Sequence, residues 1–253
     1  MDLKMKGRTA IVTGAGSPTG FGHQICLTLA GEGCNIVASD INLDWVKQTA
    51  AEVTAAGQTS IAVKADVTQI TQMKDLAKAA LDKFGRIDIM VNNAGMMTPM
   101  KPFVQSTEAE WDKMYEVDVK GVLNGSMVVI DSMVKQKYGK IVNIGSIAGK
   151  YGPPNAAVYG TVKAGVINFT RALALELIRF GINVNCICPG AVLTTKLYGD
   201  VSQEEQNKIA VTIPRGVQGR PEDIANMVAY LASDVAIHIV GQAIAVDGGK
   251  TMI

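Results

Sequence analysis

The sequence predicts a single α/β domain built as three layers, with a doubly wound sheet of seven parallel strands between two layers of helices. Short apolar runs of strand length alternate with longer helical patterns along the whole chain. Apolar residues make up 48 % of the chain but aromatic ones only 5 %, as expected of parallel strands buried on both faces. The 253 residues are enough for one large core, and no linker rich in Pro, Gly and Ser divides them. We therefore treat residues 1–253 as one domain.

The elements follow one another in a regular order. Strands are expected at 9–13, 35–39, 61–65, 87–92, 140–145, 182–187 and 243–247. Helices are expected at 20–31, 43–56, 71–84, 107–135, 157–180 and 221–233. The first helix has an apolar stripe with Ile25 and Leu29, and Gly31 and Gly33 mark its end. Gly85 ends the third helix, and Ser106 and Thr107 are candidate N-caps of the fourth.

Charge and hydropathy exclude two classes of protein. Lys plus Arg number 24 and Asp plus Glu 23, so the chain lacks the basic stripe that nucleic-acid binding needs. No stretch of eighteen apolar residues occurs, and no apolar segment follows the charged N-terminus. We expect a cytoplasmic protein with neither membrane nor nucleic acid as partner.

The four cysteines are expected to be reduced thiols in the core. Cys186 and Cys188 form a C-x-C pair inside an apolar run, and we expect their side chains on opposite faces of that strand. Neither His23 nor His238 completes a set of metal ligands. No metal site is predicted.

A glycine-rich segment, TGAGSPTGFG from Thr13 to Gly22, joins the first strand to the first helix. Backbone amides and a helix N-terminus together form a positive concavity suited to a pyrophosphate. The spacing departs from G-x-G-x-x-G because Thr19 stands where the third glycine belongs. A flexible turn without a ligand is therefore the alternative, although Pro18 stiffens the loop and Ser17 can donate a hydroxyl.

Asp40 ends the second strand, 20 residues after Gly20. From this position a carboxylate accepts hydrogen bonds from an adenosine ribose. It would repel a 2′-phosphate, and neither the loop nor Ile41 and Asn42 offers a cation. NAD is therefore favoured over NADP, although Asp40 taken alone fits a helix N-cap or an ordinary turn aspartate equally well.

Residues 140–163 read KIVNIGSIAGKYGPPNAAVYGTVK. A strand ends at Ser146, and the following helix carries Tyr159 and Lys163 on one face, four positions apart. An ammonium beside a phenol, together with an oxidised nicotinamide ring, favours phenolate, so Tyr159 can act as a base near neutral pH. The Ser146 hydroxyl can hold the substrate oxygen.

With these motifs in order, nearly the whole chain resembles the short-chain dehydrogenase/reductase family in its compact single-domain branch. The matching motifs are Thr13-Gly14 with Gly20 and Gly22, Asp66, Asn92-Asn93-Ala94-Gly95, Ser146, Tyr159, Lys163, Pro189-Gly190, Thr194 and Val246-Asp247-Gly248-Gly249. The resemblance implies a Rossmann fold and an oxidoreductase that interconverts a secondary alcohol and a ketone with NAD. It also implies a tetramer with contacts through the helices at 107–135 and 157–180.

The resemblance further implies individual roles. Tyr159 would accept the proton in alcohol oxidation, Ser146 would anchor the substrate, and Lys163 would bind the ribose and act on Tyr159. Asp66 and Val67 would contact adenine, and Pro189, Gly190, Val192 and Thr194 would hold the nicotinamide. The full set expected at the cofactor is Gly14, Ser17, Gly20, Phe21, Asp40, Ile41, Asp66, Val67, Asn93, Ala94, Gly95, Tyr159, Lys163, Pro189, Val192 and Thr194.

The chain departs from the family pattern twice. The glycine loop is two residues longer than the family's T-G-x-x-x-G-x-G. Asp118 stands where the family has an Asn that orders a water next to the lysine. A carboxylate accepts the same hydrogen bonds but partly neutralises the field of Lys163, so we expect Asp118 in the proton relay. The alternative is that Asp118 caps an unwound helix segment.

The substrate side is expected to be apolar. Met96, Met97, Met100, Tyr151 and a lid at 195–213 with Leu197 and Tyr198 would form the cleft. Lys150 and Lys196 could attract a carboxylate or a thioester carrier, or simply be solvated. A hydrophobic secondary alcohol or a 3-hydroxyacyl compound is expected. One alternative is an NADPH-dependent 3-oxoacyl-thioester reductase. The other is a non-catalytic NAD-binding subunit, and the retained Tyr159 and Lys163 count against this second alternative.

Overall fold

The computed structural model describes residues 2–194 and 202–252. In this part of the chain seven strands form one parallel sheet in the order β3-β2-β1-β4-β5-β6-β7, which confirms the predicted fold class. The strands are β1 (Thr9–Thr13), β2 (Asn35–Asp40), β3 (Ser60–Lys64), β4 (Ile89–Asn92), β5 (Gly139–Ile144), β6 (Ile182–Pro189) and β7 (Ala243–Val246).

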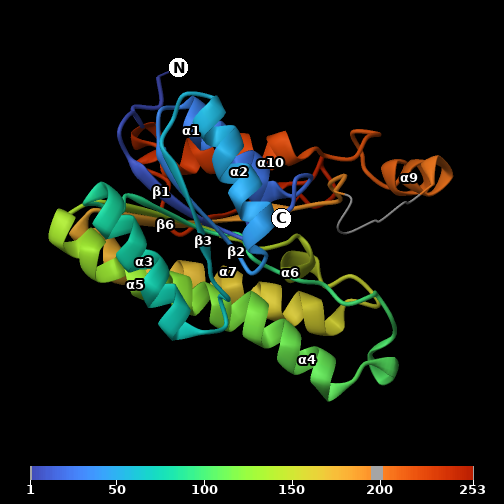
Figure 1. Ribbon diagram of the computed structural model, residues 1–253. Helices are drawn as coiled ribbons and strands as arrows, with labels where there is room; N and C mark the ends of the chain where they lie inside the picture. The colour runs from blue at the N-terminus through green and yellow to red at the C-terminus, as the bar shows by residue number, and fades with distance from the viewer. Residues whose placement is uncertain (1, 195–201, 253) are drawn as a thin grey trace.

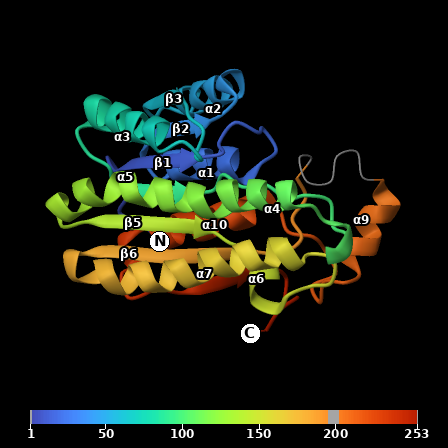
Figure 2. The same ribbon diagram turned by 90° about the horizontal axis from the view of Figure 1, so that it is seen from below.

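Helices cover both faces of the sheet, so the molecule has three layers (Figures 1 and 2). One face carries α1 (Phe21–Gly31), α2 (Leu43–Ala55) and α10 (Pro221–Ala232). The other carries α3 (Ile70–Phe84), α5 (Gly121–Gln136) and α7 (Ala157–Leu177). The shorter helices are α4 (Glu108–Met114), α6 (Ala148–Tyr151) and α9 (Gln203–Ala210), and 3-10 turns lie at Phe103–Gln105, Ile178–Phe180 and Asp234–Ala236.

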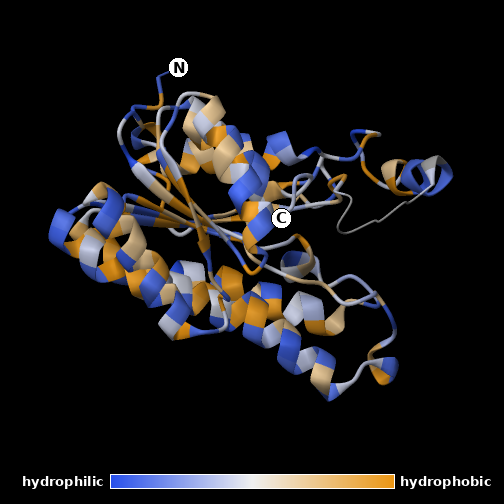
Figure 3. Cartoon of the chain, in the orientation of Figure 1, coloured by the Kyte–Doolittle hydropathy of each residue, from blue (hydrophilic) through white to orange (hydrophobic). Residues whose placement is uncertain are grey.

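Two apolar clusters hold the layers together. On one face Ile25 and Leu29 of α1 pack with Val228 of α10 over β1 and β2. On the other face Leu76 of α3 and Met133 of α5 pack over β1 and β4. Figure 3 shows apolar residues along the strands and in stripes on the long helices, whereas α9 is mostly hydrophilic. Burial of these stripes is what stabilises the helices in place.

Local signals set several helix ends as expected. Gly85 ends α3 in the left-handed region with φ +72°. The Thr107 hydroxyl accepts from the Glu110 amide in a capping box that begins α4. The expected helix 107–135 is one helical run but is interrupted by a π-helical segment at Tyr115–Lys120. A periodicity argument misses such a segment because one inserted residue shifts the pattern only locally.

Two helices escape the sequence prediction for different reasons. The single turn α6 is too short to show a period. The polar helix α9 lies in the segment expected to be a lid, and its signal was the capping box of Ser202 and Glu205. Residues 195–201 of that expected lid lie outside the described residues.

The expectation that Cys186 and Cys188 lie on opposite faces of their strand is wrong. Positions two apart in a strand share a face, and the two sulfurs lie 4.0 Å apart. All four cysteines are buried free thiols, and burial raises the pKa of Cys34 to about 12. Among residues 2–194 and 202–252 no cluster of three or more metal-ligating side chains is found. No described helix has the length and apolarity to cross a bilayer.

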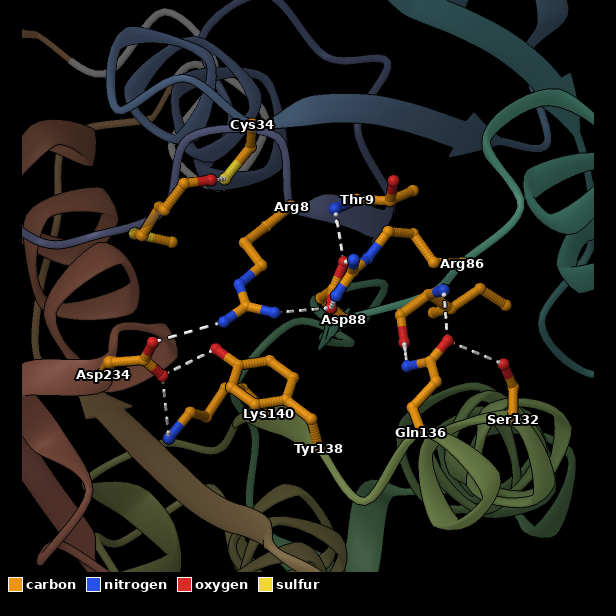
Figure 4. A network of polar contacts seen from close by, with 12 residues as sticks. Arg8, Thr9, Cys34, Arg86, Asp88, Ser132, Gln136, Tyr138, Lys140 and Asp234 are labelled. Carbon is orange, nitrogen blue, oxygen red and sulfur yellow. Dashed lines mark hydrogen bonds and ion pairs between the residues drawn. The ribbon is translucent and has the colours of Figure 1, made fainter.

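A network of charged side chains lies at the amino ends of the strands (Figure 4). Asp88, fully buried before β4, accepts from Arg8 at 3.3 Å and from Arg86 at 2.6 and 2.7 Å. Asp234 accepts from the Tyr138 hydroxyl at 2.8 Å and lies 4.0 Å from the Lys140 ammonium. The network joins the starts of β1, β4 and β5, at the edge opposite the site described next.

Candidate cofactor and catalytic site

The site lies where the strands end. All seven strands are parallel, so their carboxyl ends meet at one edge. Strand order reverses at β1, which pairs with β2 on one side and β4 on the other. In open α/β sheets this switch point opens a crevice for a ligand.

The glycine loop is folded against β2 and leaves the helix start open. The Ala15 amide donates to Ser39 O, the Gly16 amide to Asp40 Oδ2, and the Gly20 amide to Ser17 O, each at 2.9 Å. Helix α1 begins after Gly20 with no side-chain cap and no acidic residue in its first turn. The first amides of this eleven-residue helix therefore remain available to an anion.

Gly22 allows the loop and the helix to approach this closely. A Cβ at position 22 would lie 2.2 Å from Gly14 O and 2.6 Å from Asn93 Nδ2. Neither atom belongs to a freely moving chain end, because Asn93 Nδ2 itself donates to Thr13 O at 2.8 Å and Gly14 O at 3.1 Å. The loop thus has the close packing of a cradle, which favours the cradle over a flexible turn.

Asp40 faces the glycine loop. Its Oδ2 accepts from the Gly16 amide at 2.9 Å and its Oδ1 from the Asn42 amide at 3.0 Å. Each oxygen keeps a lone pair for a further donor. The cap of α2 is Asn42, whose side chain accepts from the amides of Asp44 and Trp45, so Asp40 is not the N-cap. Its bond to the Asn42 amide, two residues on, is that of a turn aspartate.

The residues expected around adenosine come from two segments, Asn93–Gly95 after β4 and Asp66–Val67 after β3. Asn93 uses its side-chain amide on the carbonyls of Thr13 and Gly14, so it supports the loop. The amides of Asn93 and Ala94 both donate to Thr13 Oγ1 at 3.1 Å, which fixes the end of β4 beside β1. Asp66 accepts from the Thr68 amide through Oδ1, and Asn124 of α5 donates to Val67 O at 2.8 Å.

Lys163 connects three parts of the structure. Its ammonium is buried and lies 2.9 Å from Asp118 Oδ1, 3.1 Å from Ile144 O and 5.8 Å from the centre of the Tyr159 ring. Burial lowers the pKa of Lys163, but the charge of Asp118 and the proximity of Tyr159 outweigh it and raise that pKa above its ordinary value. Lys163 is therefore held as an ammonium. The sequence did not reveal the role of the Ile144 carbonyl, because no side-chain pattern marks it.

Ser146 follows β5 in a turn tied to β6. Its hydroxyl accepts from the Ala148 amide at 3.1 Å, which leaves its own proton free to be donated. The Ile147 amide donates to Pro189 O at 3.1 Å and so joins this turn to the end of β6. Beyond β6, Thr194 Oγ1 is buried with no hydrogen-bond partner among the described residues. A buried hydroxyl without a partner is costly, so this oxygen marks a place for a polar ligand group.

Tyr159 lines a cavity with the segment that follows β4. Met97, Thr98, Pro99, Met100 and Met114 line the same cavity, which makes its wall mostly apolar. Met96 and Tyr151, expected in the cleft, are not among its lining residues. Leu197, Tyr198 and Lys196 lie outside the described residues.

Lys101, which lines this cavity, lies 2.7 Å from Glu110 Oε1. Lys150 of α6 is partly exposed and donates to Ala243 O of β7 at 3.1 Å, which uses one of its three N–H groups. That Lys150 attracts a substrate anion or is solvated stays a prediction.

With this geometry established, the comparisons define the class of protein. A family model described as enoyl-(acyl carrier protein) reductase matches residues 14–251. The chain belongs to the short-chain dehydrogenase/reductase family and is an oxidoreductase of that type, acting on CH–OH groups with a nicotinamide cofactor.

Individual relatives cover almost the whole chain. It is 37 % identical over 250 residues to (2S)-[(R)-hydroxy(phenyl)methyl]succinyl-CoA dehydrogenase subunit BbsD of Thauera aromatica, covering 99 % of each chain. It is 34 % identical to the 3-oxoacyl-[acyl-carrier-protein] reductase FabG of Thermotoga maritima, covering 98 % of this chain and 99 % of that one. A solved structure of 7α-hydroxysteroid dehydrogenase with NADH and 7-oxo glycochenodeoxycholic acid matches with TM-score 0.92 and 35 % identity, covering 98 % of this chain and 96 % of that one.

Proposed function

We propose that this protein is an NAD-dependent dehydrogenase that interconverts a hydrophobic secondary alcohol, or a 3-hydroxyacyl compound, and the corresponding ketone. The observation that carries the proposal is the buried Lys163 ammonium beside Tyr159, whose ring lines an apolar cavity at the carboxyl edge of the sheet. A phenol next to a fixed cation is suited to exchanging a proton with an alcohol or carbonyl oxygen.

Each residue has a definite task in this scheme. Ser146 donates a hydrogen bond to the substrate oxygen, and Tyr159 takes the proton from that oxygen in oxidation or returns it in reduction. Lys163 stabilises the phenolate form and offers its remaining N–H to a ribose hydroxyl. The cofactor, when bound, supplies the hydride acceptor or donor.

The residues present fit a dinucleotide. The open amides of α1 would hold the pyrophosphate, and the unpartnered Thr194 hydroxyl would meet the carboxamide beside Pro189 and Val192. Gly14, Ser17, Gly20 and Phe21 would form the cradle around the pyrophosphate. Asp66, Val67 and Gly95 would border the adenosine.

NAD is preferred on the evidence of Asp40. Its carboxylate is held in place by the Gly16 and Asn42 amides, and the adjacent Ile41 is exposed and uncharged. A fixed negative charge accepts from ribose hydroxyls and repels a 2′-phosphate. The neighbour of known structure was solved with NADH, which agrees with this choice.

The second candidate is a 3-oxoacyl-thioester reductase that uses NADPH. The names of FabG and of the CoA-thioester dehydrogenase subunit favour a thioester substrate. Lys101 is paired with Glu110 and is therefore not free to meet a carrier's phosphate. A thioester would in that case bind mainly through its acyl chain.

The test measures dehydrogenase and reductase rates with both cofactors over a panel of cyclic alcohols, steroid alcohols and 3-hydroxyacyl thioesters. We expect turnover with NAD that falls at least about a thousandfold in Tyr159→Phe, because the general acid/base is lost. Tyr151→Phe, which removes an exposed phenol outside the cavity, is the control. Dinucleotide binding without any turnover would instead indicate a non-catalytic subunit.

We also propose a homotetramer with contacts through α5 and α7. Leu175 on α7 and Met127 on α5 are large apolar side chains with exposed fractions of 77 % and 66 %. Both helices lie on the same outer face of the molecule (Figure 2). Exposed apolar side chains on such a face favour association between copies. Sedimentation equilibrium tests this, and a mass of one chain would contradict it.

A further inference from the structure

Asp118 is a buried carboxylate that contacts Lys163 in the candidate active site. It lies in the π-helical segment Tyr115–Lys120 between α4 and α5, and its side chain is completely buried. Its Oδ1 is 2.9 Å from the Lys163 ammonium. Both of its oxygens lie 3.3 Å from the Met96 amide, at the start of the segment that lines the cavity. The capping alternative fails, because Asp118 accepts from Lys163 and Met96, outside its own helix.

The contacts with Asp118 and Ile144 O use two of the three ammonium hydrogens of Lys163. An ammonium has three, and here one points to Asp118 Oδ1 and one to Ile144 O. Only one is left for a ribose hydroxyl, so Lys163 has no further N–H for a chain of water. Within the described part of the chain, Lys163 therefore acts as a fixed charge whose field is opposed by a second fixed charge.

Other titratable groups also surround Lys163. From β6, the contact between Cys186 and Cys188, together with burial, raises the pKa of Cys186, while the same contact lowers the pKa of Cys188. Cys186 contributes to the raised pKa of Lys163, but less than Asp118 does. From α6, Lys150 is turned to Ala243 O of β7. On α7 itself, the centre of the Tyr159 ring lies 5.8 Å from the Lys163 ammonium, so Tyr159 is the group on which the field of Lys163 acts. Asp118 is thus the one carboxylate among the described residues that acts on Lys163 directly.

We infer that Asp118 is a positioning residue that keeps Tyr159 in its protonated form to higher pH and so favours carbonyl reduction over alcohol oxidation at neutral pH. The inference rests on the proposed function. Its physical basis is that a carboxylate 2.9 Å from the ammonium cancels much of the field that would otherwise stabilise phenolate. Reduction needs a phenol that donates a proton, whereas oxidation needs a phenolate that accepts one.

The test replaces Asp118 by Asn, which has the same size and can still accept from the Met96 amide. We expect the pH at which alcohol oxidation sets in to fall by about one unit in Asp118→Asn, the order of shift that one nearby charge produces. Ketone reduction should decline at correspondingly lower pH. A second neutral variant, Asp118→Ser, should shift both profiles in the same direction.

A cofactor-free measurement separates this inference from the proposed function. Near-ultraviolet absorbance follows tyrosinate formation, and the difference from Tyr159→Phe isolates residue 159. We expect the tyrosinate signal of Tyr159 to appear about one pH unit lower in Asp118→Asn. Glu116→Gln is the matched control, since it removes the same charge from an exposed position in the same segment. It should leave both titrations unchanged.

The outcomes are distinct. Equal titration of Tyr159 in wild type and in both Asp118 variants overturns the inference, even if all three proteins are active. A shift in the titration without any turnover on the panel supports the charge coupling and overturns the proposed function. A loss of thermal stability with unmoved pH profiles would assign Asp118 a purely structural role and also overturn the inference.

Discussion

At the scale of single residues, the site depends on charges that the backbone holds in place. Asp40 is fixed by the amides of Gly16 and Asn42, and Lys163 by Ile144 O and Asp118. A side chain with backbone partners keeps its orientation before a ligand arrives, which reduces the entropy lost on binding. The sequence predicted the identities of Asp40 and Lys163 from their spacing. It also placed Asp118 near Lys163, but it could not predict the contact with Ile144 O, because that is a backbone atom that no residue type marks.

Cofactor choice can be tested at Asp40. Asp40→Asn keeps the shape and one acceptor oxygen for the Gly16 amide, but removes the negative charge. We expect kcat/KM with NAD to fall and kcat/KM with NADP to rise, so that their ratio changes at least about tenfold, the size of one charge-assisted hydrogen bond. The measurement is steady-state kinetics with both cofactors.

The control for this change is Asp44→Asn, on the exposed first turn of α2. It removes the same charge four residues further along the chain, outside the glycine loop, and should leave the ratio unchanged. An Asp40→Asn variant with the NADP efficiency of the wild type would show that Asp40 does not exclude the 2′-phosphate.

At the scale of elements, the sequence predicted the strands and helices that have a long hydrophobic pattern. It failed where a short irregular segment interrupts that pattern. Strands β1 to β7 and the long helices follow from apolar runs and a 3.6-residue period. The π-helical segment that carries Asp118 is invisible to that period, although its Asp118 lies 2.9 Å from the Lys163 ammonium. The error at Cys186 and Cys188 came from misapplying the two-residue period of a strand, since i and i+2 share a face.

The contact between α1 and α2 gives a pH-dependent stability. His23 Nε2 lies 2.7 Å from Glu52 Oε2, and this hydrogen bond lowers the pKa of Glu52. Because the folded protein holds this proton less tightly than the unfolded chain, the contact stabilises the fold above the ordinary pKa of Glu. The stabilisation is lost as pH falls through the lowered folded pKa.

We therefore expect Glu52→Gln to reduce the free energy of unfolding at neutral pH by less than about 1 kcal/mol, since the carboxylate is 39 % exposed. The difference from wild type should disappear in acid, below the folded pKa of Glu52. Urea unfolding at a series of pH values measures it. Glu116→Gln, at an exposed position in Tyr115–Lys120, should show no such trend. A difference for Glu52→Gln that grows in acid would contradict the assignment.

At the scale of the whole molecule, the two edges of the sheet have different tasks. The carboxyl edge holds the glycine loop, Asp40 and the Ser146 turn, all on connections between a strand and the element that follows it. The amino edge holds the network around Asp88 and Asp234 (Figure 4). There, burial lowers the pKa of Lys140, and the charge of Asp234 only partly opposes this. This network was not predicted, because its members come from four separate segments whose contacts only the folded sheet creates.

The division between edges predicts that stability and turnover can be separated at Asp88. Its fully buried carboxylate accepts from the Thr9 amide at 2.9 Å, from Arg8 and from Arg86. Asp88→Asn takes the carboxylate partner from Arg86 and leaves Arg8 paired with Asp234. We expect it to lower the free energy of unfolding by about 2 kcal/mol, the size of a hydrogen bond to a charged group, because both guanidinium groups are partly exposed. Urea unfolding measures this loss.

Turnover of the Asp88→Asn variant should not fall with its stability. Below the unfolding transition the kcat of Asp88→Asn should equal that of wild type, because the network lies at the opposite end of the strands from Tyr159 and the glycine loop. Asp82→Asn, which breaks an exposed i, i+4 pair with Lys78 on α3, should cost no more than about 0.5 kcal/mol and serves as the matched control. If kcat fell together with stability in Asp88→Asn, the rigid sheet would be transmitting strain from one edge to the other, and the separation of tasks would be wrong.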